Sequence, residues 1–286
     1  MNALALLLVL GSALLHATWN LFAKRVSGGP PFLWLMSTIS ALIYAPLALL
    51  ILLIERPVVG VIGIALLAGT SVLHLLYYLL LDRGYRAGDL SLVYPLSRGT
   101  GPLLAIVLAV LLLGERPTVI AIWGALLVTL GVVLLTGNPF KWRGSASHAA
   151  IVYGLLTGVV IAGYTITDKI GVSVLLLPPL VYVWAAITNR ALLMTLLVRD
   201  RWDEVRAVWR DYRRETIIIA ILDPLSYILF LIALVFSPVS YLAPARQVSI
   251  LIGAVMGTRL LAEGRTLPRL GAAAVMLAGL VALALS

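Results

Sequence analysis

Ten long apolar stretches constrain the fold of this sequence more than any other feature. Charged residues and Pro or Gly breaks delimit them as residues 3–23, 31–54, 60–82, 90–113, 118–136, 149–168, 176–198, 216–236, 240–261 and 268–285. A helix of about 20 apolar residues crosses the hydrocarbon core of a bilayer, so each stretch is long enough to span a membrane. Residues 43–54 and 103–113 are apolar on every face, whereas the strands of a membrane barrel alternate apolar and polar residues. The sequence therefore predicts an all-α integral membrane protein with ten transmembrane helices.

The composition argues against most other classes of protein. Hydrophobic residues make up 62% of the 286 residues and charged residues only 12%, whereas roughly 25% is usual in soluble domains. The ten stretches leave little sequence for a nucleotide-binding domain, so we do not expect an ATP-driven pump. The absence of cysteine excludes disulfides and thiolate metal sites. A net charge of +9 is typical of cytoplasmic loops in a membrane protein, so we expect membrane lipid around the chain and no nucleic acid partner.

The basic residues predict the orientation of the chain in the membrane. Loops after the first, third, fifth, seventh and ninth stretches hold 15 of the 21 Lys and Arg residues, whereas the opposite loops hold only Arg56, Arg116 and Lys169. Basic loops are retained in the cytoplasm. We therefore expect a multi-pass protein of the cell membrane with both termini outside the cytoplasm.

The largest cytoplasmic connection, residues 199–215, has the pattern of an amphipathic helix. Trp202, Val205, Trp209 and Tyr212 recur at helical spacing, with charges of both signs on the other faces. Such a helix lies in the membrane interface.

The sequence also contains an internal repeat. At offsets of 145 to 149 residues, the matched positions are Lys24 with Lys169, Tyr78 with Tyr227, Pro95 with Pro244, Arg98 with Arg246, and Glu115 with Glu263. The repeat predicts two five-helix units, 1–137 and 149–286, joined by a cytoplasmic linker at 138–148. Because five is odd, the second unit enters the membrane inverted. Inverted repeats are typical of carriers with a substrate site near the bilayer midplane that alternate access between the two sides.

These features together resemble one known family. The fourth stretch runs from Leu92-Val-Tyr-Pro95 to Leu113-Gly114-Glu115-Arg116, and the ninth repeats this as Leu242-Ala-Pro244 to Leu261-Ala262-Glu263. With five plus five spans, this pattern resembles the EamA family of the drug/metabolite transporter (DMT) superfamily. The resemblance implies a secondary transporter of small metabolites. It favours export of amino acids, including aromatic or apolar ones, although the superfamily also carries sugars, nucleotide sugars and other metabolites.

Polar side chains at membrane depth are the candidates for substrate binding. Placing a charged side chain at the centre of a membrane helix costs about 2.5–3.5 kcal/mol on insertion scales. Polar and charged groups in membrane helices therefore usually face the bundle interior. At helical spacing they form polar and aromatic faces on six of the stretches, whereas the fifth and tenth, rich in Gly and Ala, are expected to be scaffolding or a helix interface. The candidate cavity-lining residues are His16, Trp19, Asn20, His74, Tyr78, Tyr94, Arg98, Tyr164, Asp223, Tyr227, Tyr241, Arg246 and Gln247.

Two interpretations stay open for the intramembrane arginines. Arg98 and Arg246 suit bidentate binding of a substrate carboxylate or phosphate, but each could instead form a structural ion pair, for instance with Asp223. Arg190 lies near the cytoplasmic end of its stretch, so we expect it to snorkel to the interface. Glu115 follows the fourth stretch, where capping a helix end or surface ion pairing is a simpler role than gating.

Other function classes fit less well. The sequence contains no HExxH, P-loop or G-x-S-x-G motif, so we expect no enzyme, no metal site and no organic cofactor. A channel, a lipid-processing membrane enzyme, and uptake or antiport of another small anionic metabolite remain alternatives. His16, His74 and Asp223 are the candidates for proton coupling, if transport is coupled at all. A monomer and a homodimer both remain open.

Overall fold

The computed structural model describes residues 2–26, 28–88, 90–136, 148–261 and 266–286, and this part of the chain forms eleven α-helices. Residues 138–147 of the predicted linker, and Glu263, lie outside the described residues. The helices are α1 (Ala3–Ala23), α2 (Gly29–Glu55), α3 (Val61–Ala87), α4 (Leu90–Leu113), α5 (Val119–Thr136), α6 (His148–Lys169), α7 (Pro179–Val198), α8 (Trp202–Phe236), α9 (Val239–Ala245), α10 (Val248–Leu261) and α11 (Thr266–Leu285). A π-helical segment, η2 (Ile170–Val174), continues α6.

The predicted fold class is confirmed in its main feature. Eight helical stretches of the described chain are long and apolar enough to cross a membrane, and α5 and α11 provide shorter apolar helices. The chain is therefore an all-helical, multi-pass membrane protein. Ten crossings and the inverted repeat remain predictions.

The ninth predicted stretch is a broken helix. Pro244 lies inside α9, which ends at Ala245 with Arg246 as its C-cap, and α10 begins two residues later. The N–H of Ser249 donates to the carbonyl of Arg246 at 3.1 Å. This hydrogen bond spans three residues, as in a 3₁₀-helix, whereas the bonds of an α-helix span four. Because proline has no N–H to donate, it weakens the helix at this point. The break places Arg246 between two short helices.

Helix α8 joins the predicted amphipathic segment to the eighth stretch. Tyr212 has a non-helical φ of −131°, which kinks the helix between these two parts. At the start of α8, the ring of Trp202 packs edge-on against Trp34 of α2, with centroids 5.2 Å apart. The segment is therefore helical, as predicted, and it is attached to the bundle. Its position in the membrane interface remains a prediction.

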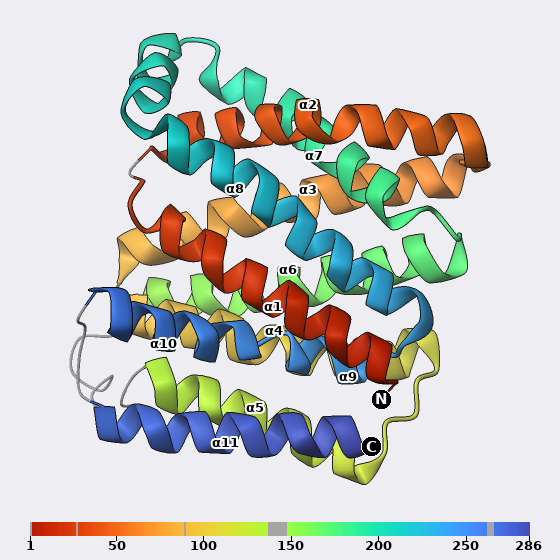
Figure 1. Ribbon diagram of the computed structural model, residues 1–286, viewed down its shortest axis with the longest axis vertical. Coiled ribbons are helices and arrows are strands. Elements are labelled where there is room, and N and C mark those ends of the chain that lie inside the picture. Colours follow the sequence, from red (N-terminus) through yellow and green to blue (C-terminus); the bar gives the residue numbers. More distant parts are fainter. Residues whose placement is uncertain (1, 27, 89, 137–147, 262–265) are drawn as a thin grey trace.

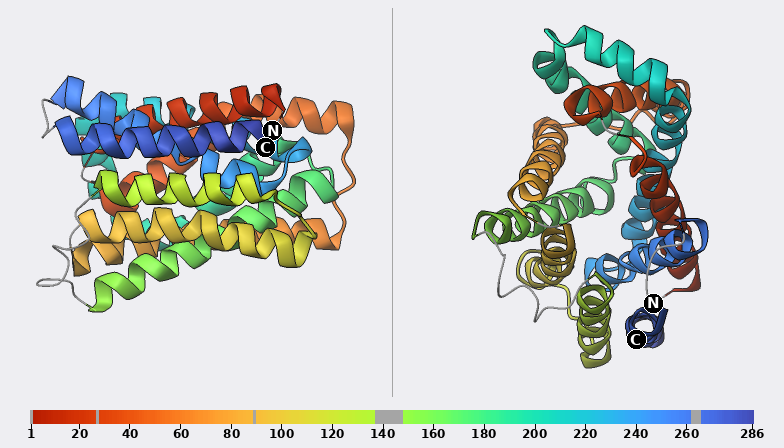
Figure 2. Two further views of the ribbon diagram at one scale, coloured as in Figure 1. Left: turned by 90° about the horizontal axis from the view of Figure 1, so that it is seen from below. Right: turned by 90° about the vertical axis from the view of Figure 1, so that its left-hand side faces the viewer.

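The helices lie side by side in one bundle, and both termini lie at the same end of it (Figure 1). Helices α5 and α11 pack against each other, and the end-on view in Figure 2 places this pair at one edge of the bundle. A Cβ added to Gly279 would lie 2.6 Å from the carbonyl oxygen of Gly124, so the two backbones approach closely. The helix interface expected for the fifth and tenth stretches is thus a contact between these two helices.

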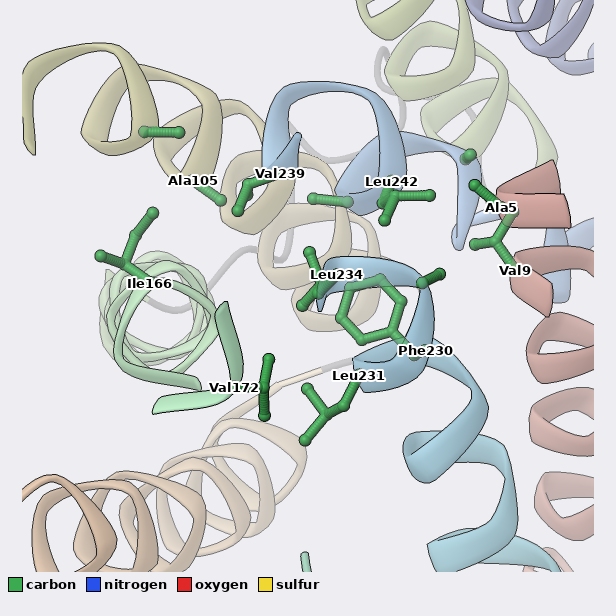
Figure 3. Packing of buried hydrophobic residues seen from close by; sticks show 14 of the residues in the cluster. Ala5, Val9, Ala105, Ile166, Val172, Phe230, Leu231, Leu234, Val239 and Leu242 are labelled. Atoms are coloured by element: carbon green, nitrogen blue, oxygen red, sulfur yellow. The ribbon is translucent and has the colours of Figure 1, made fainter. Parts of the chain in front are cut away.

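The largest apolar cluster connects α8 and α9 with their neighbours (Figure 3). Its labelled members are Ala5, Val9, Ala105, Ile166, Val172, Phe230, Leu231, Leu234, Val239 and Leu242. Phe230, Leu231 and Leu234 of α8 are almost fully buried and face helices from both halves of the chain. This packing fixes the part of α8 that follows the cavity-lining residues.

Candidate functional site

A cavity lies between helices of both halves of the chain. It contains about 680 Å³ of space free of protein atoms, counting the part that opens to solvent. Residues of α1, α3, α4, α6, α7 and α8 line it, together with Arg246 after α9. Nine of the predicted candidates are among them: His16, Trp19, His74, Tyr78, Arg98, Tyr164, Asp223, Tyr227 and Arg246. The structure therefore brings nine of the thirteen candidates to one cavity.

Four predicted candidates lie outside the cavity wall. Asn20 donates from Nδ2 to the carbonyl of His16 at 2.7 Å, and Tyr94 lies under the guanidinium of Arg98, so both support residues that line it. The Tyr241 hydroxyl accepts from the N–H of Thr118, and Gln247 donates to the carbonyl of Ala243 at 3.3 Å. None of the four residues lines the cavity in the described part of the chain, and these last two form their hydrogen bonds with residues that do not line it either.

Sequence analysis missed the contribution of α7 to the cavity and three further lining residues on α3 and α8. The missed lining residues are Thr70, Tyr77, Tyr182, Val183, Ala186, Ile187, Arg190 and Pro224. Tyr182, Ala186 and Arg190 recur every four residues on one face of α7, which is a helical signal that the sequence does contain. Thr70 lies one helical turn before His74 on α3.

Arg190 does not snorkel, so that prediction is wrong. The residue is only 5% exposed, and its Nε donates to the Ser37 hydroxyl of α2 at 3.0 Å. Its guanidinium carbon lies 5.2 Å from the centre of the Tyr78 ring. These partners on two neighbouring helices hold the charge in the interior. One of its terminal nitrogens is buried and has no hydrogen-bond partner among the described residues.

Arg98 is held by hydroxyl and imidazole groups. One terminal nitrogen donates to the Tyr77 hydroxyl at 3.0 Å and lies 3.5 Å from Nε2 of His16. Its guanidinium carbon lies 5.9 Å and 5.7 Å from the ring centres of Tyr77 and Tyr94. Such cation–π contacts stabilise a desolvated arginine. The side chain is therefore pre-positioned at the cavity wall.

Arg246 is held mainly by aromatic rings. Its guanidinium carbon lies 4.8 Å from the ring centre of Tyr227 and 4.5 Å from that of Phe230. Its Nε is buried and has no hydrogen-bond partner in the part of the chain that the structure describes. An arginine with an unused donor in a cavity suits an anionic ligand group.

Asp223 is the carboxylate that faces this cavity. Its charge lies in electrostatic range of Arg190 and Arg246, but within the described residues no basic group forms an ion pair with it at 4.0 Å or less. The alternative of a structural ion pair between Asp223 and Arg98 or Arg246 is therefore not seen in this conformation. Asp223 can accept a further donor.

Aromatic rings form the rest of the polar wall. His74 stacks on Tyr164 with centroids 4.3 Å apart and meets Tyr227 edge-on at 5.4 Å. Trp19 meets His16 edge-on, and the indole N–H of Trp19 is buried without a partner among the described residues. The cavity therefore combines charged groups with amphipathic surfaces. No group of three or more His, Cys, Asp or Glu residues in the described ranges could hold a metal ion.

Comparison with known proteins gives a family match for the first part of the chain and a fold match for all of it. Residues 3–137 match the sequence model of the EamA-like transporter family. Among 28 matching chains of solved structures, one crystal structure aligns with 100% of this chain and 98% of its own chain, at a TM-score of 0.73 and 18% sequence identity. At this identity the likeness shows a shared fold. No curated protein matches the sequence.

Proposed function

Residues 3–137 belong to the EamA-like transporter family, which makes the chain a membrane transporter of the DMT type, and we propose that it exports amino acids with aromatic or apolar side chains. Export takes place from the cytoplasm across the cell membrane. Both termini lie on the outer side of this membrane. The substrate crosses by alternating access through the cavity between the two halves. Transport of this kind requires no enzymatic step.

The proposed architecture is ten crossings arranged as two inverted five-helix repeats. An even number of crossings is supported by the position of both termini at the same end of the bundle (Figure 1). The cavity is lined from α1, α3 and α4 of the first half and from α6, α7 and α8 of the second. A substrate site shared between halves is what an inverted-repeat carrier requires.

The observation that carries the proposed substrate class is that Arg246 and Asp223 line one cavity without forming an ion pair. An amino acid presents a carboxylate and an ammonium group, so it can satisfy both side chains at once. The guanidinium binds the carboxylate in a bidentate manner, and the Asp223 carboxylate binds the ammonium. Tyr227, Tyr164 and Trp19 enclose the substrate's side chain, because their rings offer apolar faces with polar edges.

A second candidate function is favoured by Arg190, the third arginine that lines the cavity. Arg98, Arg190 and Arg246 give the cavity three guanidinium groups against the single lining carboxylate, Asp223. This excess of positive charge suits a small anionic metabolite without an amino group, moved by uptake or antiport. The two candidates differ in whether the ammonium contributes to binding.

Thermal stabilisation of the purified protein distinguishes these candidates. A ligand that binds the folded state alone stabilises it by RT ln(1 + [L]/Kd), so tighter ligands raise the melting temperature more. The panel compares phenylalanine with 2-phenylethylamine, which lacks the carboxylate, and with 3-phenylpropionate, which lacks the amine. We expect phenylalanine to stabilise most. Equal stabilisation by the amine would contradict the anion site, and stronger stabilisation by the acid would favour the second candidate.

A further inference from the structure

A second carboxylate, Asp168, lies behind the cavity wall at the end of α6. Its side chain is 0% exposed. Oδ1 accepts from the Thr70 hydroxyl at 2.5 Å and from the Tyr182 hydroxyl at 3.0 Å, and Oδ2 accepts from the Tyr227 hydroxyl. These donors come from α3, α7 and α8. We infer that Asp168 is a proton-binding site, separate from the substrate cavity, whose occupancy controls how tightly α6 is tied to three neighbouring helices.

The geometry of this cluster depends on the charge state of the carboxyl group. An ionised carboxylate is an acceptor only, so it can receive all three hydroxyl hydrogens at once. A protonated carboxyl must donate one hydrogen, which forces at least one of the three hydroxyls to turn away or reverse its role. Binding a proton therefore either removes one tie between α6 and α3, α7 or α8, or replaces a charge-assisted hydrogen bond with a weaker bond to a neutral carboxyl. These are helices from both halves of the chain, and rocking of the halves must loosen contacts of this kind.

The charged and titratable groups around Asp168 leave its charge without a counter-ion. Tyr182 of α7 and Tyr227 of α8 donate to it, and His74 of α3 and Tyr164 of α6 lie in electrostatic range of it. The next residue, Lys169, is turned elsewhere and donates to the carbonyls of Leu234 and Ser237 at 2.5 and 3.0 Å. Within the described residues, no basic group forms an ion pair with Asp168 at 4.0 Å or less. A buried charge without a counter-ion is costly, so its neutralisation by a proton is chemically accessible.

More distant charges act on this cluster from the cavity. Arg246 lies over the Tyr227 ring, with its guanidinium carbon 4.8 Å from the ring centre. Arg190 and Asp223 lie in electrostatic range of His74. A substrate that binds Arg246 and Asp223 changes the field at Tyr227 and His74, which both line the cavity and lie near Asp168. The link between proton and substrate rests on the proposed transport function, whereas proton binding itself does not.

His74 and Thr70 provide a route for the proton. The imidazole of His74 lines the cavity, and its Nδ1 lies 2.9 Å from the Thr70 carbonyl oxygen and 3.1 Å from the Thr70 hydroxyl oxygen. A hydrogen on Nδ1 is therefore shared between these two acceptors, and the Thr70 hydroxyl in turn donates to Asp168. His74 takes a proton from the cavity at Nε2 and releases one from Nδ1 to the Thr70 hydroxyl oxygen. The Thr70 hydroxyl hydrogen passes to Oδ1 of Asp168. One proton leaves the cavity and one arrives on the carboxylate, so the number of protons is conserved in the transfer.

The local sequence fixes the position of Tyr182 in this cluster. The ring of Tyr182 packs on Gly171 within η2, where an added Cβ would collide with the ring. The π-helical turn and its glycine therefore allow the hydroxyl to reach Asp168 from α7. Removing this hydroxyl alone, in Tyr182→Phe, leaves the ring packing in place.

Infrared spectroscopy tests proton binding without any substrate. Difference spectra of the purified protein between acidic and alkaline buffers report the carbonyl bands of protonated carboxyl groups. We expect one titrating component to be absent in Asp168→Asn, present in Asp223→Asn, and shifted in frequency in Tyr182→Phe, because the hydrogen bonding of the carboxyl changes. Identical spectra from the wild type and Asp168→Asn would overturn the proposal.

Reconstitution into liposomes tests the link to transport, with radiolabelled phenylalanine as the probe. Asn at 168 stays neutral throughout, so we expect exchange of phenylalanine at equal pH to persist while accumulation driven by a pH gradient is lost. Accumulation by Asp168→Asn equal to the wild type would overturn the coupling. So would a wild-type response to a sodium gradient, rather than to pH, that Asp168→Asn abolishes. If the wild type does not carry phenylalanine, the proposed substrate is wrong, and the infrared result still decides proton binding.

Thr70→Val provides a second variant if Asp168→Asn does not fold. It removes the relay hydroxyl but keeps the carboxylate, and we expect it to slow pH-driven accumulation. The matched control is Thr165→Val, because the Thr165 hydroxyl is buried on α6 and donates to Ile161 of its own helix at 2.7 Å. Equal slowing by both valine variants would show that the effect is general and would contradict the relay.

Discussion

Glu115 and Lys169 bind the two helix ends that meet at the turn between α8 and α9. The Glu115 carboxylate accepts from the N–H groups of Val239 and Ser240 at 2.7 and 2.9 Å, and from the Ser240 hydroxyl at 2.7 Å. Lys169 donates to carbonyls at the end of α8. A carboxylate at a helix N-terminus and an ammonium at a helix C-terminus both satisfy backbone groups that lack helical partners. The predicted capping role of Glu115 is confirmed, and the turn is fixed from α4 and α6.

Glu115→Gln tests this connection. The amide keeps one acceptor oxygen but presents an NH₂ group toward a backbone N–H, so one donor is left without an acceptor. We expect a loss of about 1–3 kcal/mol in the free energy of unfolding, measured by thermal or denaturant unfolding in detergent. Glu55→Gln is the matched control, because Glu55 is exposed at the end of α2. Equal effects of the two variants would show that the turn does not depend on Glu115.

Gly279→Ala tests the close contact between α5 and α11. The added methyl group would lie 2.6 Å from the carbonyl oxygen of Gly124 and 2.8 Å from the backbone nitrogen of Val128, and backbone cannot yield as a flexible side chain can. We expect a lower melting temperature. Gly271→Ala, on the same helix with open space around it, should be neutral or stabilising because alanine favours helix by up to about 1 kcal/mol. A neutral Gly279→Ala would contradict the close approach.

Reporter fusions test the orientation of the chain, which rests on the distribution of Lys and Arg. Because basic loops are retained in the cytoplasm, a fusion at Ser286 should report the exterior and a fusion near Ser145 should report the cytoplasm. The two fusions serve as controls for each other. A cytoplasmic signal from Ser286 would reverse the orientation and the proposed direction of export together.

Most helix boundaries could be predicted from sequence to within a few residues, because apolar stretches of spanning length have few alternative structures, but α3 continues five residues past the predicted end at 82. The break in the ninth stretch is harder to predict from sequence. The repeat offset changes by one residue between Pro244 and Arg246, and this is where α9 ends before α10 begins. In the first half, α4 continues through Pro95 and Arg98 without a break. Proline weakens a helix in both halves, but tertiary packing decides whether it breaks.

The errors at the site have a common physical origin. Arg190 was assigned to the interface from its distance to the helix end, but Ser37 and Tyr78 on neighbouring helices hold it inside. Asp168 shares a helical face with Tyr164, which indicates a polar face of α6. Its place in a buried hydrogen-bond cluster depends on hydroxyl donors from three other helices. Periodicity along one helix indicates which face is polar. It does not indicate which partners the other helices supply.

Arginine-to-lysine variants test how the cavity binds an anion. Lysine keeps the positive charge but loses the planar fork, so binding that depends on two parallel hydrogen bonds weakens, whereas binding to a point charge does not. We expect Arg246→Lys to lose most of the stabilisation by phenylalanine, because its Nε is unused by the protein. Arg98→Lys should have a smaller effect, since Tyr77 and His16 already engage its guanidinium. Arg190→Lys should mainly lower the melting temperature without ligand, because its Nε serves Ser37. If all three variants bind phenylalanine as the wild type does, the arginines stabilise the bundle and the carboxylate of the substrate is held elsewhere.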